Sequence, residues 1–147
     1  MNKIEYALLI VLLLFVTLGC NYSKESSNPN NTNEVIRMVK VIIDENEYIL
    51  NLEDNETVKK FINYLPQELE MSELNGNEKY AYLSTSFPVN PFNPQRIYAG
   101  DVMLYGDNCL VIFYQSFDTS YSYTKIGHID NLPNLGNGNV IVRLQIS

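Results

Sequence analysis

Three regions with different hydrophobic patterns follow one another along the 147-residue chain. Residues 6–18 form an unbroken apolar run, and residues 21–33 are polar and rich in Asn and Ser. From about residue 34 onward, short stretches rich in β-branched and aromatic residues alternate with turn-forming polar ones. This pattern indicates one folded domain over residues 35–147, preceded by two segments of a different kind.

The periodicity within the domain predicts short β-strands separated by turns. Turn-forming residues occupy positions 75–77 and 106–108, and an acidic hairpin turn starts at Asp44. Residues 87–95 contain three prolines, which predicts an irregular loop, with a brief extended piece after it at residues 97–98. The predicted strands cover residues 35–43, 48–52, 68–71, 79–83, 102–105, 109–114, 121–129 and 140–146.

One helix is predicted between the second and third strands. Its apolar positions recur at the spacing of one helix face, at Val58, Phe61, Ile62 and Leu65. Asp54 or Asn55 caps its start and Pro66 ends it, while residues 132–138 form a loop or a single helical turn. Eight short strands with one clear helix predict a mainly β fold, a small closed eight-stranded barrel with one or two short flanking helices.

The N-terminal apolar run has the features of an export signal, because it follows Lys3 and ends at Gly19-Cys20. As a helix it would extend only about 20 Å, which is short for a hydrocarbon core of about 30 Å. Residues 15–20, Phe-Val-Thr-Leu-Gly-Cys, resemble the lipobox of bacterial lipoprotein precursors, although Thr17 stands where Leu is commonest. The resemblance implies removal of residues 1–19 and lipidation of the Cys20 thiol.

A plain signal peptide, or an anchor helix with an incidental cysteine, is the alternative. We expect the lipoprotein, with residues 20–34 as a flexible tether between the lipid on Cys20 and the domain. The domain would then lie on the extracytoplasmic face of the cell membrane. Loss of residues 1–19 removes Lys3 and Glu5 together, so the net charge stays near −7. An acidic domain predicts no nucleic-acid partner and no attraction to anionic lipid through its own surface.

The chain offers little for metal or nucleophilic chemistry. Cys20 and Cys109 are its only cysteines and His128 is its only histidine, so we predict no zinc site, no internal disulfide and no cofactor. The acidic stretch 44–56 fails as a calcium loop, because its sixth position lacks Gly and its twelfth lacks an acid. We expect Cys109 to be a small buried apolar residue and His128 to be structural; a catalytic Cys109–His128 pair is the less favoured alternative.

Residues 113–124 are the most unusual stretch, because five aromatic residues lie among small hydroxyl-bearing ones. Tyrosine combines an apolar face with a polar tip, so such clusters suit recognition of peptides or ring-shaped ligands. Packing within a barrel core explains the stretch equally well. Alternation places Tyr121, Tyr123 and Lys125 on one face, and Lys125 indicates that this face reaches water.

Three motifs occur in order along the domain: MSELNGNEKY at residues 71–80, AGDVMLYG at 99–106 and SFDTSYSY at 116–123. Together they resemble the bacterial cyclophilin-like domain family over residues 38–147. The resemblance implies an eight-stranded barrel with a groove on its face, lined in part by residues 103–105 and 110–114. The candidate ligand-binding residues are therefore Met103, Tyr105, Phe113, Phe117, Tyr121 and Tyr123.

The resemblance does not supply a catalytic set, so no catalytic residue is predicted. In true cyclophilins an Arg lies beside an apolar proline pocket. The basic residues of this domain lie in segments that match no such active site: Arg37, Arg96, Lys125 and Arg143. We expect a membrane-tethered, non-catalytic module that binds a peptide or small molecule. A weak peptidyl-prolyl isomerase of the cell envelope is the alternative, and a structural partner in an envelope complex is a third possibility.

Overall fold

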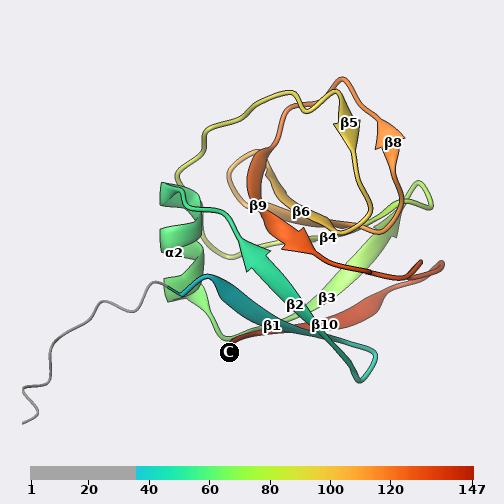
Figure 1. Ribbon diagram of the computed structural model, residues 1–147, viewed down its shortest axis with the longest axis horizontal. Coiled ribbons are helices and arrows are strands. Elements are labelled where there is room, and N and C mark those ends of the chain that lie inside the picture. Colours follow the sequence, from blue (N-terminus) through green and yellow to red (C-terminus); the bar gives the residue numbers. More distant parts are fainter. Residues whose placement is uncertain (1–35) are drawn as a thin grey trace, which may run out of the picture. The chain divides into compact units, whose positions relative to one another are not determined.

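Eight strands close into a barrel in which every neighbouring pair is antiparallel (Figure 1). The computed structural model describes residues 36–147, so the predicted signal, Cys20 and the whole predicted tether lie outside the described residues. The order around the barrel is β1-β10-β3-β4-β7-β6-β9-β2. The strands are β1 (Met38–Ile43), β2 (Asn46–Leu52), β3 (Gln67–Leu74), β4 (Glu78–Tyr82), β6 (Asp101–Tyr105), β7 (Cys109–Phe113), β9 (Thr124–Ile129) and β10 (Val140–Ile146).

These elements confirm the mainly β, closed eight-stranded barrel predicted from the sequence. Two short strands, β5 (Arg96–Ile97) and β8 (Phe117–Asp118), form a separate two-stranded sheet, and β8 was not predicted. The strand predicted from residue 121 begins three residues later, because the backbone of Tyr123 instead pairs with Phe92 of the proline-rich loop. The two N–H···O distances of this pair are 2.9 and 3.0 Å.

The single helix within residues 36–147 is α2 (Glu56–Tyr64). Asn55 caps it by accepting a hydrogen bond from the Val58 N–H at 2.9 Å, and the chain leaves the helix before Pro66. Val58 and Phe61 pack into the same core as the inward-facing strand residues, so α2 is held by its apolar face. Residues 132–138 form a loop without a helical turn. No helix in the described part of the chain is long and apolar enough to cross a membrane.

The barrel interior also contains one buried charge, Lys79 on β4, whose side chain is 0% exposed. Its Nζ atom donates hydrogen bonds of 2.7 Å to the carbonyl oxygens of Gly136 and Gly138 and lies 5.1 Å from the centre of the Tyr114 ring. Burial lowers the pKa of the Lys79 ammonium group. These contacts join the loop before β10 to the barrel wall and satisfy a charge that apolar surroundings would disfavour.

Closure of the barrel between β2 and β9 depends on the absence of a side chain at Gly127. A Cβ atom placed there would lie 2.1 Å from the backbone oxygen of Asn51, well inside van der Waals contact. Gly127 also lies at the irregularity where the pairing of β9 with β6 shifts register, after Val102. The close approach of two backbones therefore requires glycine at this position.

We expect Gly127→Ala to lower the free energy of unfolding by about 3 kcal/mol or more, because the added methyl group forces the two strands apart. Urea denaturation of the two proteins measures the difference. Gly136→Ala is the matched control. A Cβ atom at Gly136 meets nothing within 4 Å, so only its φ of +64° opposes the change, at about 1 kcal/mol. Equal losses in the two variants would show that close approach is not the constraint.

Candidate functional site

β7 has apolar side chains on both of its faces. Leu110 and Ile112 point into the barrel core, whereas Cys109, Val111 and Phe113 point outward into a second apolar cluster. All five are buried. This two-sided burial accounts for the unbroken apolar sequence of the strand, as in sheets covered on both sides.

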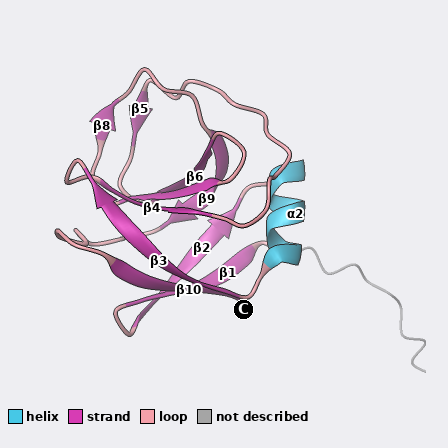
Figure 2. Ribbon diagram, turned by 180° about the vertical axis from the view of Figure 1, so that it is seen from behind, coloured by secondary structure: helices cyan, strands magenta, loops and turns pink. Residues whose placement is uncertain are grey.

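A second layer of chain covers the outward face of β7. We define this outer layer as residues 92–99 and 116–123, which include β5 and β8. Figure 2 shows these two strands side by side, apart from β1 and β10. The Arg96 guanidinium and the Asp118 carboxylate join them across a distance of 2.7 Å, and Ile97 is fully buried against the second apolar cluster. The outer layer therefore buries the outward-facing side chains of β7.

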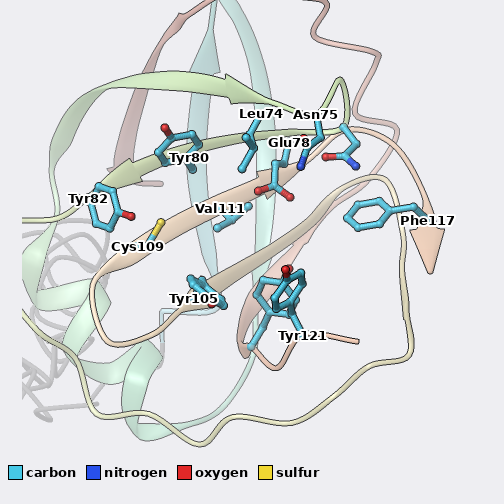
Figure 3. Close-up of a pocket in the computed structure, with 12 residues that line it drawn as sticks. Leu74, Asn75, Glu78, Tyr80, Tyr82, Tyr105, Cys109, Val111, Phe117 and Tyr121 are labelled. Atoms are coloured by element: carbon cyan, nitrogen blue, oxygen red, sulfur yellow. The ribbon is translucent and has the colours of Figure 1, made fainter. Parts of the chain in front are cut away.

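An open pocket of about 350 Å³, which we call the outer pocket, lies where this cover is incomplete (Figure 3). Its volume is at the lower end of the range of about 300–1,000 Å³ for small-ligand sites. Its walls come from the end of β3, the β3–β4 turn, β4, β6, β7 and the outer layer, and half of the lining residues are aromatic. The lining consists of Leu74, Asn75, Asn77, Glu78, Tyr80, Tyr82, Tyr105, Cys109, Val111, Phe117, Tyr121 and Tyr123.

The aromatic rings of the outer pocket contact one another and remain partly open to water. The Tyr105 ring lies 6.1 Å from the Tyr121 ring in an edge-to-face arrangement and 5.7 Å from the Tyr123 ring. Tyr80 and Tyr82 form a second edge-to-face pair at 6.1 Å. Tyr82 is 70% exposed and Tyr121 is 61% exposed. The pocket thus presents aromatic rings that are partly open to an incoming molecule.

Glu78 supplies the one charged group of the lining. Figure 3 shows its carboxyl group over Val111, between Tyr80 and Phe117. Burial raises the pKa of Glu78 from 4.5 to about 7, with a further contribution from the negative charge of Glu73. The carboxyl group is therefore about half ionised at neutral pH.

Cys109 and Asn77 complete the polar part of the lining. Burial, followed by the charge of Glu78, raises the pKa of the Cys109 thiol, so the sulfur stays protonated and is a poor nucleophile. The buried Oδ1 atom of Asn77 accepts no hydrogen bond from any described residue. Neither group adds a charge to that of Glu78.

Comparison with protein families matches residues 41–145, which include parts of all eight barrel strands, to the cyclophilin-like family. The chain belongs to the cyclophilin-like family. No curated protein and no solved structure matches it. The resemblance stated from three motifs is therefore confirmed for the domain, and the proposed lipobox lies outside the matched residues.

The cyclophilin-like barrel brings four of the six predicted binding residues together in the lining of the outer pocket: Tyr105, Phe117, Tyr121 and Tyr123. The other two, Met103 and Phe113, are 2% and 0% exposed and lie in the second apolar cluster beside the pocket. They do not line the pocket, because the outer layer packs over the part of β6 and β7 that carries them. Binding by the four lining residues stays a prediction.

Sequence reasoning did not select the residues that β4 contributes, Glu78, Tyr80 and Tyr82. The signal was present, since residues 79–83 were predicted as a strand and the preceding turn fixed where it starts. Alternation along that strand places these three side chains on the face opposite to Lys79. What was missing was the pairing of β4 with β7, which sets Tyr80 beside Val111.

The four basic residues considered in the sequence analysis lie outside the pocket lining, and three of them are paired with carboxylates. These pairs are Arg96 with Asp118, Lys125 with Glu53, and Arg143 with Glu68. Lys125 was expected to share a water-facing surface with Tyr121 and Tyr123. Its ammonium group instead lies 3.2 Å from Glu53, and Tyr123 is only 6% exposed.

His128 does not pair with Cys109. Its Nδ1 atom lies 3.0 Å from Oδ1 of Asp101, whose other carboxylate oxygen accepts a hydrogen bond from the Tyr98 N–H. The alternative of a Cys109–His128 catalytic pair is therefore wrong. Within residues 36–147, no group of three or more side chains is arranged to hold a metal ion.

Glu78→Gln should make stability less dependent on pH. Between pH 4.5 and about 7 the folded protein keeps the Glu78 proton that the unfolded chain releases, so ionisation costs stability as the pH rises. After allowance for solvent screening, we expect the variant to match the parent near pH 4 and to exceed it by about 1–2 kcal/mol at pH 8.

Urea denaturation at both pH values measures this difference. Glu70→Gln is the matched control, because it removes an exposed carboxylate from β3 outside the pocket. A Glu78→Gln protein that gains no stability over the parent between the two pH values would contradict the burial of this carboxyl group.

Proposed function

We propose that this cyclophilin-like chain is a non-catalytic binding module that holds a peptide segment or a small ligand in the outer pocket. We further propose that a lipid on Cys20 holds the module at the extracytoplasmic face of a membrane. The observation that carries the binding proposal is the outer pocket itself, an open cavity of about 350 Å³ walled by six aromatic side chains. Exposed aromatic clusters of this kind are typical of recognition surfaces.

The distribution of positive charge supports a function without prolyl isomerase chemistry. Rotation about an X–Pro bond has a barrier of about 18–20 kcal/mol, and true cyclophilins assist it with an Arg beside the proline. The lining of the outer pocket contains no Arg or Lys, and its one charge is the carboxyl group of Glu78. A carboxylate does not replace a guanidinium group as a donor to the peptide nitrogen or carbonyl.

The sequence before the domain supports the tether. An apolar run ends in Gly19-Cys20, and the net charge of −7 does not favour attraction of the protein surface to anionic lipid. Acyl chains contribute about 0.8 kcal/mol for each buried CH₂ group, so lipidation supplies the membrane affinity that the protein surface lacks.

Cys20→Ala in the full chain, expressed in a bacterial host, should release the protein from the membrane fraction and abolish its labelling by a radioactive fatty acid. Cys109→Ala is the matched control, since it removes the other cysteine and should leave both readouts unchanged. A parent chain that takes up no fatty-acid label, together with unchanged membrane retention of Cys20→Ala, would contradict lipidation and indicate an uncleaved helical anchor.

The full chain in a non-ionic detergent should not accelerate isomerisation of proline-containing test peptides above the detergent blank, because no cation lines the pocket. A true cyclophilin in the same detergent provides the positive control. Catalysis that Tyr105→Ala abolishes and Tyr98→Ala leaves intact would overturn the proposal in favour of an envelope isomerase. Tyr98 is a similarly exposed ring outside the lining.

A further inference from the structure

The outer pocket combines two features that stabilise the same kind of ligand. Six of its twelve lining residues carry aromatic rings, and the only charged member of the lining is Glu78. The face of an aromatic ring is negative, and it attracts an ammonium group that lies within about 6 Å of the ring centre. A carboxylate among such rings adds a full negative charge. Both the rings and the carboxylate therefore favour a positively charged ligand.

No side chain within residues 36–147 already fills this role. The Nζ atom of Lys79, the nearest lysine in sequence, points to the opposite side of β4 and is bound by two carbonyl oxygens. The ammonium group of Lys125 pairs with Glu53, and the guanidinium group of Arg96 pairs with Asp118. The negative charge of Glu78 is thus left without a positive partner among the described residues.

We propose that the outer pocket binds an organic ammonium ion, placed between the Glu78 carboxylate and the surrounding tyrosine rings. The inference rests on the proposed function and specifies the chemistry of its ligand. Two sources share this chemistry, the quaternary ammonium head of a free small molecule and the lysine side chain of a peptide. A cavity of about 350 Å³ accommodates either group, and the net charge of −7 attracts cations toward the domain.

Such a ligand links binding to pH through Glu78. Glu73 on β3 is the charged group that acts on this carboxyl, and its charge is negative. Burial, with a further contribution from Glu78, raises the pKa of Cys109 on β7, Tyr114 after β7 and Tyr123 before β9, none of which carries a positive charge. In the absence of a ligand, burial and the negative charge of Glu73 raise the pKa of Glu78 to about 7. A bound cation favours the ionised carboxylate, so binding releases a proton below that pH.

The test is calorimetric titration of the full chain, in one non-ionic detergent throughout, with choline and with 3,3-dimethylbutan-1-ol. The second compound has the same shape as choline but carries no charge. At pH 8 we expect choline to bind at least about tenfold more tightly than the neutral compound, and its affinity to fall by about tenfold or more at pH 5.5. Choline does not titrate, so this change reports on the protein.

Two variants and their controls assign the effect to named groups. Glu78→Gln should weaken choline binding by about tenfold, remove its pH dependence and leave the neutral compound unaffected, whereas Glu70→Gln should change none of these. Tyr121→Leu should weaken choline binding, and Tyr98→Leu, which removes a ring of similar exposure outside the lining, should not. A second pair of ligands is a lysine-containing peptide and the same peptide with N-acetyl-lysine. Comparing their affinities with that of choline distinguishes a peptide ligand from a free small molecule.

The outcomes separate this inference from the proposed function. Equal affinity for choline and the neutral compound, with loss of both in Tyr121→Leu, would overturn the ammonium ligand and leave a binding module for neutral molecules. No binding of choline or of the lysine peptide would also overturn it. Isomerase activity that depends on the pocket would overturn the proposed function instead.

Discussion

The two-sided burial of β7 is the constraint on which the other features of the domain depend. A barrel strand normally has one face toward the core and one toward water, but here Leu110 faces the core while Val111 faces a second apolar cluster. Five buried residues in succession require cover on the outside, and the outer layer supplies it. Because that layer consists of two-residue strands and loops, its cover is incomplete, and the outer pocket lies where it ends.

The barrel could be predicted from the sequence because its strands carry their own signals. Alternation, β-branched composition and turn residues at positions 75–77 and 106–108 are local properties that indicate where the strands lie. The strands β1, β3 and β9 nevertheless differ from the predicted bounds by about three residues at one end. The site depends on contacts that no local pattern contains. The aromatic-rich stretch 113–124 stands out in the sequence. Periodicity alone does not show that the outer layer buries Phe113 and leaves Tyr121 exposed. Glu78 was missed for the same reason, because its place in the pocket results from the pairing of β4 with β7.

Membership of the cyclophilin-like family specifies the barrel and leaves the chemistry of its face open. In this chain the outward face of the barrel carries a carboxyl group among tyrosine rings. The side chains that β4, β6 and the outer layer contribute to the outer pocket add little to the barrel core. The core residues of those strands, such as Ala81 and Leu104, point the other way. Function can therefore change on this face at little cost to the fold.

The alternation along β4 explains why a negative charge in the pocket stays available to a ligand. Glu78 and Lys79 are neighbours in sequence with opposite charges, and in an open chain they would attract one another. The strand sends them to opposite faces, where burial acts on each separately, raising the pKa of Glu78 and lowering that of Lys79. Lys79 donates hydrogen bonds to the carbonyl oxygens of Gly136 and Gly138, so its charge holds the loop before β10 against the barrel. Glu78 has no equivalent partner on its own face, and a cation that enters the pocket recovers the stabilisation that burial removed.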